Sequence, residues 1–283
     1  YIIPLQESPD LPPDLYAKAN PKSSTGRLDI FTRTITDYGH RFEEVRAGYS
    51  GPLYIEVFPR SFPVRVQTGL SLNQLRVMKG TTLIQDDELM WRAHNQPLLY
   101  DKSGEPMSPD DYLVEQGLFM GIDLEGRGEG DIIGWRARHH TEGIDLSRED
   151  EYDRLKFWEP IRRRDDEPLI LMPEAFYLFA GVERVRIPAD LSAEMIPYDT
   201  SSGELRTHYA GFFDSGFGMA DPPGAHVVLE VRSHDVPFRL THGQTFFRLM
   251  FHRNSMLPDV LYGNGGSHYQ SQALALSKHF RRA

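Results

Sequence analysis

The sequence contains the same pattern of residues twice, at an offset of 174 to 176 positions. In the later part of each copy the gapless matches are Glu56 with Glu230, Pro63 with Pro237, Arg65 with Arg239, Gly69 with Gly243 and Leu75 with Leu249. In the earlier part they are Pro12 with Pro188, Asp14 with Asp190, Leu15 with Leu191, Ala17 with Ala193 and Pro21 with Pro197. A chain of 283 residues with such a repeat is expected to build two similar units from the same elements.

The first copy starts later within the pattern than the second. A strand-like segment, 117–124, lies about 110 residues before Glu230, but only 55 residues precede Glu56. The chain also begins with Tyr1, so we expect roughly 55–60 residues of the first unit to be absent from it. The predicted organisation is an N-terminally shortened first unit over 1–90, a connector over 91–116, and a second unit over 117–283.

Strand signals dominate the sequence. Segments rich in β-branched and aromatic residues, or alternating between apolar and polar ones, are typical of strands. They lie at 53–58, 64–66, 117–124, 226–232 and 238–240, with 169–172 and 176–179 as a further strand pair. Helix is predicted only over 109–116, with Ser108 as its cap, and in a short piece over 72–77. The predicted fold class is therefore mainly β with few short helices.

Composition and charge exclude several classes of function. The net charge of −10 argues against a nucleic-acid-binding surface, although local arginines and a metal ion can hold the phosphates of a single nucleotide. The absence of cysteine excludes disulfides, a thiol nucleophile and the His/Cys/Cys zinc site of many nucleobase deaminases. No apolar run approaches the ~20 residues of a membrane span and no signal peptide is visible, so a cytoplasmic protein without a membrane partner is expected.

The segment 20–27 has the composition of a phosphate-binding loop. It places the hydroxyls of Ser23 and Ser24 close to Gly26 and Arg27. Hydroxyls and backbone N–H groups donate to phosphate oxygens, and a glycine permits close approach of the backbone. A guanidinium forms bidentate hydrogen bonds with the charged phosphate. For this segment taken alone, a surface turn rich in serine and glycine is the alternative.

A glutamate occupies the same place in an apolar strand of both copies, at Glu56 and at Glu230. A carboxylate is costly to bury in such a strand, and burial raises the pKa of such a group, which suits a general base or a proton shuttle. The alternative is a glutamate at a strand edge that points to water. Duplication alone would also copy a structural residue.

The C-terminal segment 261–272 is glycine-rich, polar and aromatic, and it follows the last predicted core strand. Such a segment can fold over a ligand as a lid, and a disordered tail is the alternative. The mixed charge run 162–167 is expected to be a solvated turn between strands.

Together the phosphate loop, the glutamate strand and the C-terminal segment resemble the dCTP deaminase / dUTPase family. They look most like the long bacterial 2′-deoxycytidine 5′-triphosphate deaminases that carry two such units. The Ser-Ser-x-x-Arg motif that binds the triphosphate in the family corresponds here to Ser23, Ser24 and Arg27. The residues that correspond to the nucleoside pocket and the lid are Ala210, Asp214, Gly216, Glu230, Tyr262, Tyr269 and Gln272.

The resemblance implies both a fold and an activity. Each unit would be a distorted dUTPase-like all-β barrel (a β-clip), and the chain would form a homo-oligomer with a trimeric arrangement of units. The activity would be hydrolytic deamination of dCTP to dUTP and ammonia, in which a glutamate, Glu230 or Glu56, activates the water that attacks C4 of cytosine. Magnesium would accompany the triphosphate, and no zinc would take part.

The two copies differ in their motifs. The second has 199–203 where the first has 23–27 and thereby loses the arginine, and the first has Arg46 where the second has Asp214. The phosphate motif thus survives in the first copy, and the nucleoside motif and the lid survive in the second. A composite site that uses both halves is therefore expected.

Two other functions stay open. A carboxylate that directs water at the α-phosphate, with Asp214 as a candidate, would make the chain a dUTP diphosphatase or a bifunctional deaminase and diphosphatase. A β-protein that kept the fold but lost turnover would be a non-catalytic, nucleotide-binding regulatory protein.

Overall fold

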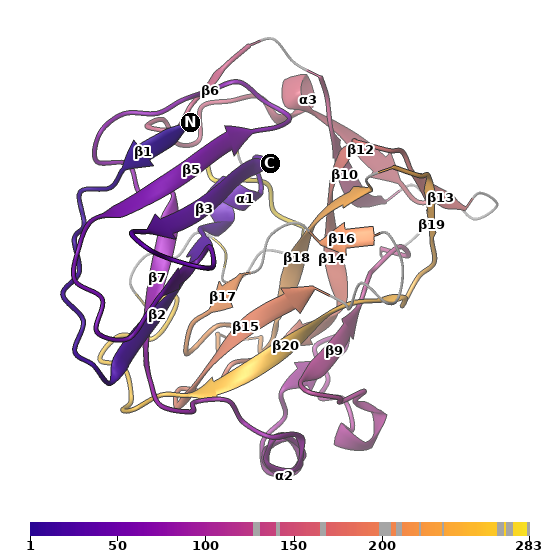
Figure 1. Cartoon of the computed structure of the whole chain (residues 1–283). Helices are drawn as coiled ribbons and strands as arrows, with labels where there is room; N and C mark the ends of the chain where they lie inside the picture. The colour runs from indigo at the N-terminus through magenta and orange to yellow at the C-terminus, as the bar shows by residue number, and fades with distance from the viewer. Residues whose placement is uncertain are drawn as a thin grey trace. The chain divides into compact units, whose positions relative to one another are not determined.

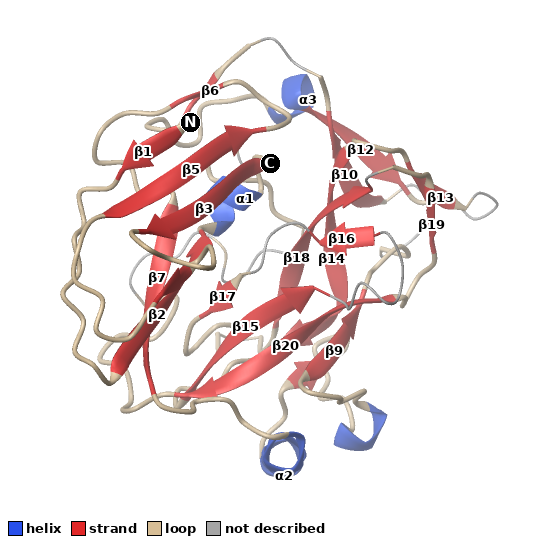
Figure 2. Cartoon of the chain, viewed as in Figure 1, coloured by secondary structure: helices blue, strands red, loops and turns tan. Residues whose placement is uncertain are grey.

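The computed structural model describes residues 1–126, 131–139, 142–164, 168–197, 205–207, 211–220, 222–233, 235–264, 269 and 274–281. The chain forms two compact units that alternate along the sequence. Unit 1 comprises Tyr1–Thr82, Arg138–Phe157 and Leu276–Ala283, and unit 2 comprises Leu83–Ala137 and Trp158–Ala275. Figure 1 labels the elements of both units, and Figure 2 shows that strands predominate, which confirms the mainly β prediction.

The described residues of unit 1 form three small sheets, with strand orders β1-β5-β3, β4-β2-β7 and β11-β6. The strands and helices are β1 (Ile2–Pro4), β2 (Leu15–Pro21), α1 (Ser23–Gly26), β3 (Ile30–Thr36), β4 (Glu44–Val45), β5 (Leu53–Pro59), β6 (Val64–Arg65), β7 (Asn73–Lys79), β11 (Ile144–Asp145) and α3 (Arg154–Phe157). Aromatic rings from all three segments of this unit pack together: Phe157 contacts Phe62 edge to face and Phe280 in a tilted arrangement. Aromatic packing of this kind holds distant parts of the chain in one core.

Unit 2 contains a six-stranded sheet with the order β12-β10-β14-β18-β16 and β8 beside β14, a four-stranded sheet β17-β15-β20-β9, and the pair β13-β19. The elements are α2 (Asp86–Asn95), β8 (Leu99–Tyr100), η1 (Pro109–Asp111), β9 (Leu118–Gly121), β10 (Ile132–Ala137), β12 (Trp158–Arg162), β13 (Leu169–Leu171), β14 (Phe176–Val185), β15 (Leu191–Pro197), β16 (Leu205–Thr207), β17 (Phe212–Phe213), β18 (Ala225–Ser233), β19 (Phe238–Leu240) and β20 (Thr245–Arg253). Buried apolar residues of both larger sheets join one hydrophobic core, to which α2 adds Leu89 and Ala93.

The repeat in the sequence is also a repeat of strand pairings. In unit 1, Ile2 lies opposite Glu56 in the antiparallel β1–β5 pair. In unit 2, Leu178 lies opposite Glu230 in the antiparallel β14–β18 pair, which reproduces the offsets of 176 and 174. The β2–β7 pair and the β15–β20 pair correspond in the same way. Each glutamate therefore occupies the same register position within its own unit.

Several local predictions are wrong. The expected helix at 72–77 is strand β7, because pairing with β2 along its whole length outweighs the weak helical pattern. The expected helix over 109–116 is only the single turn η1. The segments 169–172 and 176–179 do not pair with each other, since β13 pairs with β19 and β14 pairs with β10, β18 and β8.

The two units also divide the chain differently from the expected boundaries at 90 and 116. The segment Leu83–Ala137, which includes most of the expected connector, belongs to unit 2, because β8 pairs with β14 and Leu98 and Leu99 are fully buried in its core. The last residues, from Leu276, belong to unit 1. Polar composition had suggested a connector, but a short apolar stretch within it is enough to anchor the segment.

Among the described residues, none of the helices combines the length and the apolar character that crossing a membrane requires.

Candidate active site

The predicted phosphate motif forms helix α1 of unit 1. The N–H groups of Thr25 and Gly26 bond to the carbonyl oxygen of Lys22, at 2.8 and 3.0 Å. Thr25 Oγ1 donates to the carbonyl oxygen of Leu72 at 2.8 Å, which fixes the turn to the start of β7. The first turn of a helix presents N–H donors that the helix itself does not use, and such donors suit an anion.

The residues of this motif differ in burial. Ser23 is exposed, whereas Ser24 and Arg27 are buried. Ser277 Oγ, from the last residues of the chain, donates to the carbonyl oxygen of Ser24 at 2.8 Å and lies 2.9 Å from Nδ1 of His279. Burial holds the pKa of His279 below its usual value. Sequence reasoning missed these two residues because no local motif connects them to a turn more than 250 positions away.

Glu56 lies on β5 in unit 1 and is half-buried. Its Oε2 atom lies 3.2 Å from Nε of Arg33, which is its direct cross-strand neighbour on β3. The guanidinium of Arg33 also lies over the rings of Phe31 and Phe42. The carboxylate of Glu56 is thus held in an ion pair on a partly solvated face of the sheet.

Glu230 lies on β18 in unit 2 and is only 6% exposed. Cross-strand pairing places Glu230 beside Leu178 of β14, and Leu178 beside Trp135 of β10, so their side chains share one face of the sheet. The flanking residues on β18, Leu229 and Val231, are fully buried in the core on the opposite face. The structure therefore buries the carboxyl group of Glu230, with the apolar side chain of Leu178 as its cross-strand neighbour.

Arg232 is a buried cation that sequence reasoning missed. It lies two residues after Glu230 on β18, so both side chains project from the same face of the strand. Its guanidinium donates to the carbonyl oxygen of Glu174 and lies 5.9 Å from the ring centroid of Phe176. Two signals in the sequence could have identified it. Period-two alternation places it on the face of Glu230, and the first copy has the apolar Phe58 at the matching position.

Asp214 is exposed and begins a turn after β17, whose next residues, 215–218, are buried. This turn contacts the start of the C-terminal segment. The N–H of Tyr262 donates to the carbonyl oxygen of Ser215 at 2.8 Å. Gly216 has a φ of +94°, and a Cβ there would come within 2.8 Å of Leu261. The ring of Tyr262 packs on Phe217, with centroids 5.5 Å apart. The nucleoside motif and the first part of the expected lid therefore lie together.

The same turn reaches the sheet that carries Glu230. The carbonyl oxygen of Phe217 accepts the N–H of Ile187 at 2.8 Å, just beyond the end of β14. Of the three remaining predicted residues, the structure describes one. Tyr269 is half-buried, and Ala210 and Gln272 lie outside the described residues.

In the part of the chain that the structure describes, no three His, Asp or Glu side chains gather as a metal site. Magnesium commonly keeps several waters and is held through substrate phosphates with one or two carboxylates. A magnesium ion that binds together with a triphosphate would therefore need few ligands from these residues.

Comparison with known proteins identifies the family. The family model of the 2′-deoxycytidine 5′-triphosphate deaminase (DCD) C-terminal domain matches residues 85–280, and that of the DCD N-terminal domain matches residues 1–81. A crystal structure of 2′-deoxycytidine 5′-triphosphate deaminase from Agrobacterium tumefaciens has a TM-score of 0.86 and 45% sequence identity. That likeness covers 94% of this chain and 75% of the other.

Curated relatives share a smaller region. The "dCTP deaminase, dUMP-forming" of Kocuria rhizophila is 36% identical over 113 residues, 38% of this chain and 55% of the relative. The enzyme of the same name from Nocardioides sp. is 35% identical over 129 residues, 44% of this chain and 62% of the relative. The matched region thus spans little more than half the length of these curated relatives.

The duplicated strand pairings define an all-β protein with the dUTPase-like fold. Within that class, the chain belongs to the 2′-deoxycytidine 5′-triphosphate deaminase family.

Proposed function

We propose that this chain is a dCTP deaminase that hydrolyses the C4–N4 bond of the cytosine base. One water is consumed and ammonia leaves, so that dCTP becomes dUTP. Glu230 is the general base: its carboxylate takes a proton from the attacking water and returns it to the leaving amine. The observation that carries this role is the burial of Glu230 on the β18 strand of a chain from this family.

The choice of Glu230 over Glu56 rests on their surroundings. A base that must take a proton from a water works best where bulk solvent does not compete for its hydrogen bonds. Glu230 is buried, whereas the carboxylate of Glu56 is about one-third exposed and paired with Arg33. Glu56 is the same residue in the other copy, but its ion pair suits a structural role.

The proposed triphosphate ligands are Ser23, Ser24 and Arg27. The first turn of α1 supplies backbone N–H groups, the serines supply hydroxyls, and the guanidinium of Arg27 supplies a fixed positive charge. Magnesium would bind with the triphosphate and neutralise part of its charge.

The proposed nucleoside pocket uses the turn at Asp214, with Tyr262 packed against it. Ala210, Tyr269 and Gln272 complete the proposal on the strength of the family motif. A lid of this kind would exclude water other than the one that reacts.

A second candidate is a reaction that continues to dUMP and pyrophosphate. The names of the curated relatives, "dCTP deaminase, dUMP-forming", favour it. Incubation with dCTP and magnesium, with ammonia measured and the nucleotides separated, distinguishes the outcomes. Ammonia with dUTP supports the deaminase, and ammonia with dUMP supports the bifunctional enzyme. Nucleotide binding without either product would instead identify a regulatory protein.

The trimeric arrangement of units is part of the proposal. Analytical ultracentrifugation should give a mass of three times 32.4 kDa, or a multiple of that. A monomer that still turns over dCTP would contradict this assembly.

A further inference from the structure

A cavity of about 630 Å³ opens in unit 2 on residues of β10, β12, β13, β14 and β19. This volume lies in the range of pockets that bind small organic ligands. Five arginines line it: Arg136, Arg162, Arg163, Arg164 and Arg239. The part of the charge run that was expected to be a solvated turn thus contributes three of them.

The cavity is separate from the proposed catalytic face. Arg136 of β10 lies opposite Tyr177 of β14, and Tyr177 lies opposite Val231 of β18. Glu230 is the neighbouring residue on β18, and adjacent side chains on a strand project to opposite faces. The lining residues Arg136 and Tyr177 therefore belong to the face of the sheet that Glu230 does not occupy.

Positive charge predominates among the described residues that line the cavity. Among the described lining residues Glu159 is the one carboxylate, and Arg136 Nε donates to it at 3.1 Å. Five arginines against one carboxylate give the described lining an excess of positive side chains, in a chain whose net charge is −10. The residues that follow Arg164 in the sequence, 165–167, are acidic and lie outside the described residues. Guanidinium groups match the geometry of phosphate oxygens better than any other side chain.

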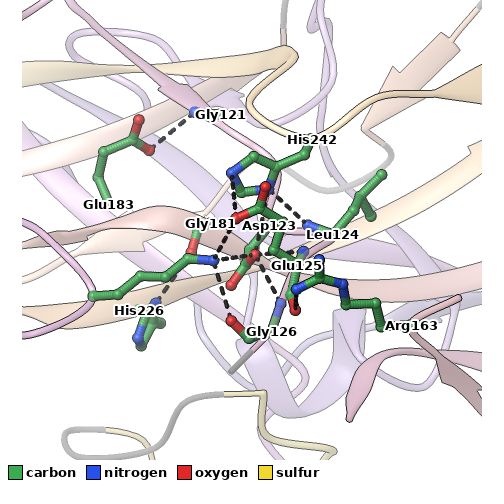
Figure 3. Close-up of polar contacts among 11 residues, drawn as sticks. Gly121, Asp123, Leu124, Glu125, Gly126, Arg163, Gly181, Glu183, His226 and His242 are labelled. Atoms are coloured by element: carbon green, nitrogen blue, oxygen red, sulfur yellow. Dashed lines mark hydrogen bonds and ion pairs between the residues drawn. The ribbon is translucent and has the colours of Figure 1, made fainter. Parts of the chain in front are cut away.

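One edge of the cavity is held by a network of polar contacts, shown in Figure 3. Lys102 Nζ donates to Asp123 Oδ1 at 2.8 Å, which anchors the segment after β9. Nδ1 of His242 accepts the N–H of Leu124 at 3.2 Å, and Arg163 Nη1 donates to the carbonyl oxygen of Glu125 at 3.1 Å. His242 and Arg163 both line the cavity, so part of its wall is ordered before any ligand arrives.

The remaining wall is apolar. It includes the partly exposed side chains of Leu124, Ile161, Leu169 and Ile170. An inorganic anion would leave this surface uncovered, whereas a base or sugar attached to phosphates would cover it. We propose that the cavity binds an organic polyphosphate of nucleoside triphosphate size, at a second site that does not depend on the deaminase activity.

Calorimetric titration of the full chain tests the proposal, with inorganic tripolyphosphate as the first probe and ATP as the second. The chain should carry Arg27→Gln, which weakens the proposed catalytic phosphate site. Binding should persist in that background at about 0.15 M ionic strength. Adding Arg162→Gln or Arg239→Gln should weaken it about tenfold each, the loss expected for a charge-assisted hydrogen bond. The matched control Arg41→Gln removes the same charge from an exposed residue of unit 1 and should change nothing.

The affinities for ATP and for tripolyphosphate distinguish the outcomes. ATP should bind more tightly than tripolyphosphate, because only ATP covers the apolar wall. The proposal is overturned if tripolyphosphate and ATP do not bind in the Arg27→Gln background, or if the cavity arginines do not affect binding. It is also overturned if ATP gains nothing over tripolyphosphate. The Arg162→Gln and Arg239→Gln chains should keep dCTP turnover, so a failure here leaves the deaminase proposal intact.

Discussion

Nε of Arg33 lies 3.2 Å from Oε2 of Glu56, directly across the β3–β5 ladder. The corresponding glutamate of the second copy, Glu230, is buried and lies beside Leu178 of β14. Duplication therefore kept the position of the carboxylate in the strand and changed its surroundings. The surroundings separate a structural glutamate from a candidate base.

The ion pair of Arg33 and Glu56 should contribute little to stability. Both side chains are about one-third exposed, and such pairs are worth about 0.2–1 kcal/mol. Glu56→Gln should lower the free energy of unfolding by no more than that. A double-mutant cycle with Arg33→Gln measures the coupling, and a coupling of several kcal/mol would contradict a solvent-screened pair.

Arg27→Gln should weaken the binding of dCTP. Losing a charged hydrogen bond to a phosphate costs about 1.5–3 kcal/mol, so KM should rise about ten- to a hundredfold while kcat changes less. Arg41→Gln is the matched control and should leave both constants unchanged. Because Arg27 is buried, the melting temperature of the Arg27→Gln variant must be compared with that of the wild type. A folded variant with an unchanged KM would exclude Arg27 as a phosphate ligand.

Glu43 should make unit 1 less stable as the pH rises. Burial raises its pKa from 4.5 to about 7, against smaller opposing effects of Thr34 and Arg33. Between these two values the unfolded chain releases a proton that the folded chain keeps, so stability falls as pH increases through this range. Above about pH 7 the loss should be complete and on the order of 3 kcal/mol.

Glu43→Gln should remove this dependence, since the amide does not ionise. The variant and the wild type should be equally stable near pH 4.5, and the variant should be the more stable at pH 8. Glu44→Gln is the control, because that neighbour is exposed and pairs with Arg41. Unfolding free energies measured against pH decide the point, and parallel curves for wild type and Glu43→Gln would refute it.

Gly218→Ala should be strongly destabilising. Gly218 has a φ of +70°, and a Cβ would lie 2.1 Å from the carbonyl oxygen of Val185. Gly243 has nearly the same φ, +73°, but no heavy atom within 4 Å of such a Cβ. Gly243→Ala should therefore cost only the backbone strain, about 1 kcal/mol, whereas Gly218→Ala should cost at least about 2 kcal/mol. Denaturant unfolding of the two variants should show this order, and equal losses would mean that the backbone relaxes at Gly218.

Much of the strand framework was predictable, because the repeat marks positions that pairing must preserve. Glu56 and Glu230 recur at matched register positions, and Gly69 and Gly243 both occupy turns with positive φ. Helix α2 was missed because its residues are mostly polar and only two of them are buried. Strand β7 was mistaken for helix because local propensity says nothing of the partner strand that decides its conformation.

The candidate site was predictable only where its residues lie in a local motif. Ser23, Ser24 and Arg27 are adjacent in the sequence, so their chemistry can be read together. Ser277 meets Ser24 only through the fold, and the five arginines around the cavity of unit 2 come from three separate stretches of sequence. That the phosphate motif and Glu230 act in one site stays a prediction.

The most direct test compares ammonia release from dCTP by Glu230→Gln and Glu56→Gln under identical conditions, with melting temperatures as a check on folding. Loss of a general base should slow turnover about 10²–10⁴-fold in Glu230→Gln, whereas Glu56→Gln should stay within a few-fold of the wild type. Equal losses from the two folded variants, or full activity in Glu230→Gln, would contradict the assignment of Glu230 as the base.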